Sequence, residues 1–127
     1  DTATDYALYH AAQWGSEAIL SVPCCQHELN LQVTRDALPP LTDYGILKER
    51  LCALATDAVR AKLLESQGYE VQVLEFIDLA HSPKNLLLRA RKAPVSSDKR
   101  QAARQEAARR LQLLGAEQTL WRLLEQA

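Results

Sequence analysis

Residues 41–77 read LTDYGILKERLCALATDAVRAKLLESQGYEVQVLEFI. Apolar side chains recur here at intervals of three and four residues, the spacing of one face of an α-helix: Leu47, Leu51, Leu54, Ala58 and Ala61. Gly68 ends this pattern, and valines then alternate with polar residues, which is typical of a β-strand. The sequence therefore predicts a helix over 42–67 and a strand over 69–77.

Two further strands are predicted on either side of this unit. A short apolar run at 18–22 ends at Pro23 and has the length and β-branched content of a buried strand. A leucine-rich run at 85–91 follows 69–77 after a loop short enough for an antiparallel pair. The order strand, helix, strand implies a βαβ crossover with 18–22 and 69–77 paired in parallel. We therefore expect an α/β fold with a mixed sheet that ends in an antiparallel hairpin.

Helices are predicted at both ends of the chain. We expect one over 2–14, a short one near 28–33, a basic amphipathic one over 97–114, and a last turn or two after Gly115. Pro94 lies in a linker that divides the chain into an α/β region, 1–92, and a basic helical tail, 93–127.

Composition restricts the class of protein. The chain has 127 residues, of which 47% are hydrophobic and 24% charged, as in ordinary globular proteins. No apolar run approaches the roughly 18–20 residues that span a bilayer, and no signal peptide is visible. Only three cysteines are present and two are adjacent, so a disulfide framework is not expected. We therefore predict a cytoplasmic location and no membrane partner.

Charge is divided unevenly along the chain. Residues 1–83 contain five Lys and Arg against twelve Asp and Glu, whereas residues 84–127 contain ten against four. The basic segment could bind RNA or another anionic partner, or it could be a solvated helix face. One hypothesis is therefore a non-catalytic interaction module that binds RNA or protein through the C-terminal helix.

The segment Pro23-Cys24-Cys25-Gln26-His27 is the sharpest local feature. It follows a predicted buried strand, at the end where open α/β sheets bind ligands. Three interpretations compete. A cysteine could be a nucleophile activated by His27, the two cysteines and His27 could bind a metal, or the segment could shape a substrate pocket. The spacing is not a standard zinc spacing, so we predict no metal site.

Four separated motifs resemble one methyltransferase-like family of the class I S-adenosylmethionine-dependent methyltransferases. These motifs are Asp-Thr-Ala-Thr-Asp at 1–5, Val-Pro-Cys-Cys-Gln-His-Glu-Leu-Asn at 22–30, Tyr-Gly-Ile-Leu-Lys-Glu-Arg at 44–50 and Ser-Pro-Lys-Asn-Leu-Leu at 82–87. In that family the first motif follows the fourth strand and the second follows the fifth. The resemblance covers about residues 1–92 and implies the C-terminal half of a Rossmann-like domain.

The resemblance also implies roles for particular residues. Asp1 would contact the cofactor, and Cys24, Cys25 and His27 would carry the chemistry. The methyl acceptor would be met by Pro23, Asp5, Tyr44, Lys48, Arg50 and Asn85. Asp5 has an alternative role as a favourable charge in the first turn of a helix. The acceptor itself is not specified, and RNA is one candidate.

The cofactor cradle is expected to lie outside this chain. The family's glycine-rich loop belongs upstream of Asp1, and the four glycines here are too far apart to form a Gly-x-Gly turn. The chain also contains no methionine. We therefore expect a piece of a longer protein that does not bind S-adenosylmethionine by itself, with its own missing N-terminal half as a partner.

The truncation has a structural consequence. The strand at 18–22 would lack a neighbour, so we expect its edge to be covered by a homodimer or by the basic C-terminal helix. Trp14 and Trp121 are expected to be packing anchors, and Cys52 to belong to the core.

Overall fold

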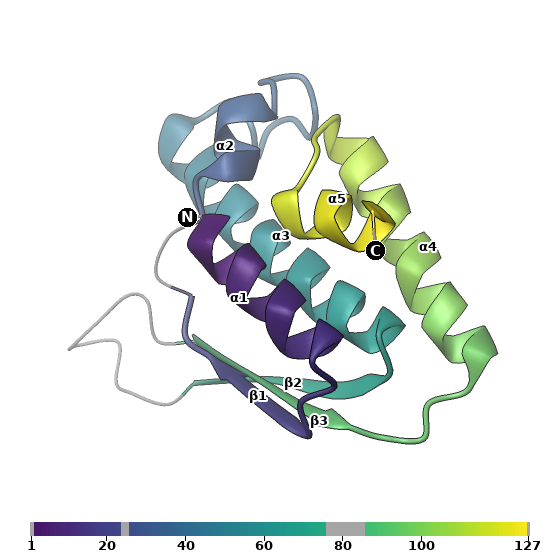
Figure 1. The fold of residues 1–127 in the computed structure, drawn as a ribbon. Helices are drawn as coiled ribbons and strands as arrows, with labels where there is room; N and C mark the ends of the chain where they lie inside the picture. The colour runs from purple at the N-terminus through teal and green to yellow at the C-terminus, as the bar shows by residue number, and fades with distance from the viewer. Residues whose placement is uncertain (1, 24–25, 76–85, 127) are drawn as a thin grey trace.

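The computed structural model describes residues 2–23, 26–75 and 86–126. Its elements, in chain order, are α1 (Thr2–Gln13), β1 (Ala18–Ser21), α2 (Glu28–Gln32), α3 (Gly45–Ser66), β2 (Tyr69–Glu75), β3 (Leu86–Lys92), α4 (Ser97–Leu114) and α5 (Thr119–Gln126) (Figure 1). Each predicted helix and strand is present within a few residues of its expected bounds, because apolar periodicity and glycine stops are local signals.

The predicted strand pairing is wrong. The sheet has the order β1-β3-β2, and β3 is antiparallel to both neighbours. β1 and β2 therefore run in the same direction, but β3 lies between them and they share no hydrogen bonds. The β2–β3 hairpin is confirmed, with Val71 opposite Ala90, whereas the parallel pair and the mixed sheet are not found. The structure is an α/β fold on a small antiparallel sheet.

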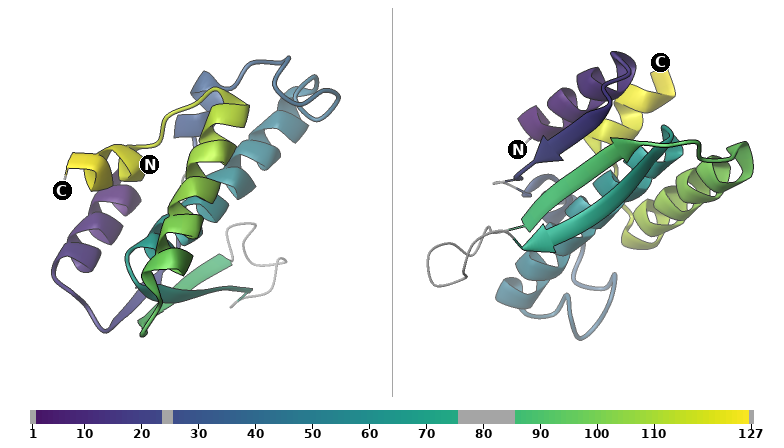
Figure 2. Two further views of the ribbon diagram at one scale, coloured as in Figure 1. Left: turned by 90° about the vertical axis from the view of Figure 1, so that its right-hand side faces the viewer. Right: turned by 90° about the horizontal axis from the view of Figure 1, so that it is seen from below.

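All the helices lie on one face of this sheet. Figure 1 shows α1, α3 and α4 side by side above the strands, and the view from below in Figure 2 meets the opposite face with no helix over it. Side chains alternate accordingly, since successive strand residues point to opposite faces. Leu88 and Ala90 of β3 are fully buried beneath the helices, whereas Arg89 and Arg91 are exposed on the open face.

α3 forms the centre of the core. Its buried arc includes Cys52, Val59, Leu63 and Leu64, which pack with Leu8 of α1 and Tyr69 of β2. The apolar row that predicted the helix lies mostly on another arc, where Leu54 is 61% exposed. The helix therefore has two apolar faces, of which one packs against the sheet and the neighbouring helices.

The C-terminal region packs against the α/β region. The inner row of α4 is buried along α3 through Ala103, Ala107, Leu111 and Leu114, as the sequence predicted. α5 lies across α1 and buries Leu120 and Leu124. The helix expected to cover β1 is thus engaged elsewhere, because α4 lies along α3 and not over the edge of β1.

Three glycines have a positive φ, and two of them end long helices. Gly68 has φ +93° between α3 and β2, and Gly115 has φ +64° at the end of α4, where its N–H bonds to the Gln112 carbonyl. A positive φ is readily accessible to glycine, so each position ends a helix and redirects the chain. In the part of the chain that the structure describes, no helix is long and apolar enough to cross a membrane.

A candidate site around a buried arginine

The Pro23–His27 segment begins two residues after β1 and leads directly into α2. Pro23 and Gln26 are buried, while His27 is exposed at the position before the first residue of α2. Cys24 and Cys25 lie outside the described residues, as do Asp1 and Asn85. The described residues on either side therefore place the segment between the end of β1 and the start of α2. This is the end of the strand at which the sequence predicted it.

Gln26 attaches this segment to α3. Its Nε2 atom donates to Asp57 Oδ2 at 3.0 Å and to the Pro23 carbonyl at 3.3 Å. The first contact joins residues 31 positions apart in the chain, and the second bridges the segment across its own turn. Both acceptors are buried, so loss of this side chain would leave polar atoms without compensation for their lost hydration.

Asp57 belongs to a buried ion network centred on Arg60. The Arg60 Nε atom donates to Asp5 Oδ1 at 2.6 Å, and Nη1 donates to Asp57 Oδ1 at 2.9 Å. Arg60 is 1% exposed and Asp5 is fully buried. The second Asp5 oxygen accepts from the Leu120 N–H of α5 at 3.3 Å. The motif at 1–5 therefore reaches the guanidinium directly through Asp5, and the motif at 22–30 is linked to it through Gln26 and Asp57.

The buried charges of this network compensate one another, although the network joins residues from distant parts of the sequence. A buried charge is tolerated only when it is paired and hydrogen-bonded. One arginine lies between two carboxylates, and the remaining carboxylate oxygens receive N–H groups from Gln26 and Leu120. Asp57 and Arg60 are spaced as i and i+3, which places them on the same side of α3. The available signal in the sequence was a pair of opposite charges, Asp57 and Arg60, within the buried part of this helix, and neither of them has a role predicted from the sequence.

Asp5 is the predicted site residue whose surroundings are best defined. Both carboxylate oxygens already have partners, Arg60 and the amide of Leu120, and the side chain is closed to solvent. Its described role is to hold α1, α3 and α5 together. The role in binding a methyl acceptor stays a prediction, for which the carboxylate would have to exchange one of these partners.

The three residues expected at the start of α3 are placed differently from one another. Lys48 Nζ donates to the Asn30 carbonyl at 2.9 Å, which connects α3 to α2 just after the Pro23–His27 segment. Tyr44 precedes the helix and Arg50 follows on its first turns, and both are exposed. Of these three residues, Lys48 is therefore the one that the structure brings to the candidate site.

Asn30 is a further candidate site residue, which belongs to the motif at 22–30 but has no role predicted from the sequence. Its Oδ1 atom is buried and has no hydrogen-bond partner within the described ranges. An amide oxygen closed to solvent without a donor costs free energy, on the order of 1–3 kcal/mol. It lies on α2, next to the segment that the motifs single out, and it can accept an N–H or O–H from a ligand.

Cys52 is a core thiol. It is fully buried on α3, and this burial raises the pKa of the Cys52 thiol, an effect that the positive charge of Lys48 partly offsets. A thiol kept neutral in an apolar environment is a poor nucleophile. Any thiol chemistry would therefore belong to Cys24 or Cys25. Among the described residues, no three His, Cys, Asp or Glu side chains gather as they would around a metal ion.

The basic residues of α4 are largely engaged within the chain. Arg104 stacks over Trp121 with its guanidinium carbon 4.5 Å from the ring centre, and Arg100 donates to the Ser66 carbonyl. Trp121 is thus the packing residue expected from the sequence. For Trp14 that expectation is wrong, because its side chain, just after the end of α1, is 79% exposed and stacks on the ring of His10.

The described residues do not form a cradle for S-adenosylmethionine. A nucleotide-type cofactor requires glycines in the turn from a strand into a helix, where the backbone approaches the ligand closely. Gly15 and Gly68 instead lie between a helix and the strand that follows it, and Gly115 lies between two helices. The residues present therefore do not fit the cofactor without additional elements.

Comparison with known proteins gives one match. Residues 1–32 match a methyltransferase domain. The match is to a family model of that description and covers a quarter of the chain, from the first residue to the end of α2. It includes α1 with Asp5, strand β1 and the whole Pro23–His27 segment. No curated protein and no solved structure matched the chain. The N-terminal quarter is therefore methyltransferase-like, and it contains both motifs that the network of Arg60 and Asp57 connects.

Proposed function

We propose that this chain is the C-terminal half of a class I, Rossmann-like methyltransferase domain, whose parent protein transfers a methyl group from S-adenosylmethionine to an acceptor. The observation that carries the proposal is the methyltransferase match over residues 1–32. That match ends with α2, so it contains the 1–5 and 22–30 motifs that Arg60 connects in the structure. The sheet that ends in the β2–β3 hairpin is also compatible with the fold that the motifs imply.

The open surfaces of the chain support additional elements. β1 is an edge strand, and its Leu20 is 67% exposed on the face of the sheet that no helix covers. Trp14, in the turn from α1 into β1, is also exposed. Large apolar side chains gathered at an unpaired strand edge favour contact with further protein. The missing N-terminal half of the domain, carrying the glycine-rich turn, is the occupant we propose.

In this arrangement the Pro23–His27 segment forms one wall of the acceptor site. Transfer of a methyl group between two bound molecules depends mainly on their alignment and on exclusion of water. Gln26 would hold the segment in place through Asp57, and Cys24, Cys25 and His27 would contact the acceptor. The cofactor would supply the methyl group, and the residues of this chain would hold the acceptor in the orientation needed for transfer.

Calorimetric titration with S-adenosylmethionine tests the proposal. We expect micromolar binding by the full-length parent protein and none by the 127-residue chain. Mixing the chain with the separately produced upstream half should restore binding. Binding by the chain alone would contradict our account of the missing cradle. Absence of binding by the parent would remove the methyltransferase assignment.

The parent protein also separates the interpretations of the cysteines. Transfer of a labelled methyl group to cellular RNA and to protein fractions is measured for Cys24→Ser, Cys25→Ser and His27→Ala. A nucleophilic cysteine predicts loss of activity by a factor of at least about 10³ for one serine variant. A pocket role predicts a higher KM for the acceptor with kcat largely kept. Cys52→Ala serves as the control, because that thiol is fully buried in the core and cannot meet an acceptor.

A further inference from the structure

α3 carries a second apolar row that the other described residues cover only in part. Leu47, Leu51, Leu54 and Ala58 lie on one side of the helix, and Leu47 and Leu54 are exposed. The buried arc of the same helix, with Cys52 and Leu63, points elsewhere. Amphipathic helices usually present charged residues to water on the side away from the core. Here that side is apolar over about three turns, or ~16 Å of helix.

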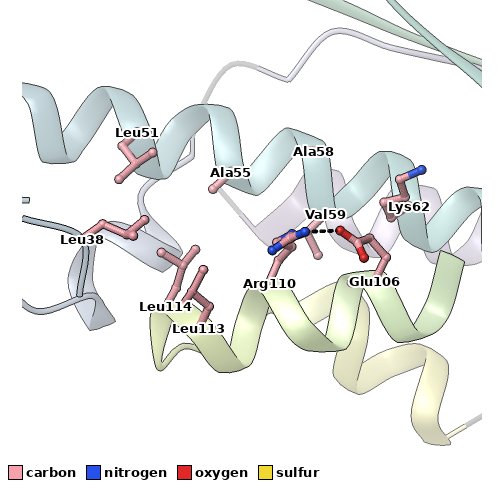
Figure 3. Close-up of a pocket in the computed structure, with 11 residues that line it drawn as sticks. Leu38, Leu51, Ala55, Ala58, Val59, Lys62, Glu106, Arg110, Leu113 and Leu114 are labelled. Carbon is pink, nitrogen blue, oxygen red and sulfur yellow. Dashed lines mark hydrogen bonds and ion pairs between the residues drawn. The ribbon is translucent and has the colours of Figure 1, made fainter. Parts of the chain in front are cut away.

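α4 supplies a second wall to this surface. Figure 3 shows Leu113 and Leu114 facing Leu51 and Ala55 across the space between the two helices. Together with Leu38 they enclose a cavity of about 300 Å³ whose lining is almost entirely carbon. Leu113 is 53% exposed. The row on α3 and this cavity form one surface, which we call the α3–α4 groove.

The rim of the groove carries more positive than negative charge. Arg109 and Arg110 both pair with the single carboxylate of Glu106, and Lys62 on α3 pairs with Glu65. These rim side chains are all partly exposed, so the extra positive charge faces solvent. Arg50 adds another exposed cation on α3, three residues from Leu47. A second copy of the groove would bring like charges together, which disfavours self-association through this face.

We propose that the α3–α4 groove binds an amphipathic helix of a protein partner, with apolar anchors in the groove and acidic residues along its flanks. Helices dock into such grooves through side chains at positions i, i+3 or i+4, and i+7. The apolar row on α3 has this spacing and Leu113 lies opposite. Carboxylates of the partner would meet Arg109, Arg110 and Lys62. This interaction is independent of the proposed methyl transfer.

The probe is a pair of labelled synthetic peptides of about 16 residues, each with leucines at the anchor spacing. One has glutamate on both flanks and the other has lysine at the same positions. Fluorescence anisotropy with the 127-residue chain at low salt should show micromolar binding of the acidic peptide. The basic peptide should bind at least tenfold more weakly, because the rim charges repel it.

Variants locate the binding. Leu54→Glu, an exposed position whose change spares the core, should weaken the acidic peptide at least tenfold. Leu20→Glu, equally exposed on the open sheet face, is the matched control and should leave binding unchanged. The double variant Lys62→Glu, Arg109→Glu should reverse the preference between the two peptides. Thermal melting of each variant confirms that it is folded.

Three results would overturn the proposal. Equal affinity for both peptides would show that the charge on the rim does not favour an acidic partner over a basic one. Unchanged binding by Leu54→Glu would place the peptide elsewhere. Finally, if sedimentation showed that the chain dimerises and that Leu54→Glu dissociates the dimer, the groove would bind a second copy of the chain instead of a partner helix.

Discussion

Arg60 is the residue on which the interior depends most. Its guanidinium neutralises charge between two carboxylates in a space closed to water, with N···O distances of 2.6 Å to Asp5 and 2.9 Å to Asp57. Removing one partner of a buried ion pair leaves an uncompensated charge, and the free energy lost is much larger than the net contribution of the intact pair to stability. The helices α1, α3 and α5 therefore share one electrostatic centre.

Replacing this guanidinium has a large expected effect. Arg60→Met should lower the free energy of unfolding by about 3–5 kcal/mol, because two buried carboxylates lose their cation. Urea denaturation followed by circular dichroism measures the change. The control is Arg91→Met, which breaks an exposed pair with Glu70 at 3.2 Å and should cost at most about 1 kcal/mol. Similar losses for both variants would contradict the picture of a buried network.

The buried thiol predicts a dependence on alkaline pH. Burial raises the pKa of Cys52, and burial also raises the pKa of the Tyr69 hydroxyl, with Glu17 adding to the shift. Both groups are neutral when protonated and deprotonate more easily in the unfolded chain. Their stabilising contribution is therefore complete below the unfolded thiol pKa of about 8.5 and is lost as pH rises above it.

Cys24→Ala, Cys25→Ala leaves Cys52 as the only thiol on which to test this. We expect the reaction of Cys52 with a thiol reagent at pH 8 to be limited by global unfolding of the chain. We also expect the melting temperature of this double variant to fall between pH 8.5 and 10.5. The comparison chain carries Cys52→Ala as well and should lose less stability over that range. Rapid labelling of folded Cys52 at pH 8 would be inconsistent with its burial.

Among the elements, α4 has the clearest local definition of its ends. The Ser96 side chain accepts from the Lys99 N–H at 3.3 Å at the start, and Gly115 in the left-handed region ends the helix. Such caps satisfy backbone groups that have no partner within the helix. They explain why a helix with so many charged residues begins and ends where the sequence predicted.

Removing the first cap gives a prediction for this element. Ser96→Ala should destabilise the chain by about 1 kcal/mol, since the Lys99 N–H loses its acceptor. Ser97→Ala is the matched control, because Ser97 is already inside the helix, where alanine is favoured. The two variants are compared by thermal unfolding. If Ser97→Ala were the more damaging change, the cap would not be at Ser96.

At the scale of the whole molecule, the open sheet face and the free edge of β1 dominate. Only Ile19 of this strand is turned into the core and fully covered, while Leu20 faces solvent. An unpaired strand with exposed apolar side chains pairs readily with another chain. When the rest of the domain is absent, the expected cover is a second copy of the same edge.

We therefore predict a homodimer of the isolated chain at tens of micromolar, joined through β1. Leu20→Lys should shift it to a monomer, because a lysine at the edge disfavours strand pairing. Leu54→Glu, an exposed position on α3 and outside the sheet, should leave the dimer intact. Sedimentation equilibrium gives the mass of each variant. If the unsubstituted 127-residue chain were a monomer with β1 open to water, the prediction would be wrong.

The sequence by itself determined the elements and part of the site. Repeats of three and four residues, alternation in strands, and glycine at the ends of helices are all local features, and they predicted α3, α4 and the β2–β3 hairpin. The motifs at 1–5 and 22–30 likewise indicated methyltransferase-like sequence, which the match over residues 1–32 supports. These inferences succeed because each depends on neighbours along the chain.

Only the tertiary structure decided how these parts meet. The position of β3 between β1 and β2 depends on which edge of the hairpin β1 joins, and the pattern within each strand does not encode that choice. The apolar repeat of α3 predicted a helix but not which of its faces would be buried. Arg60 became central because Asp5, 55 residues away in the chain, packs against it. Long-range pairing of this kind is fixed by packing and desolvation, which no single stretch of sequence contains.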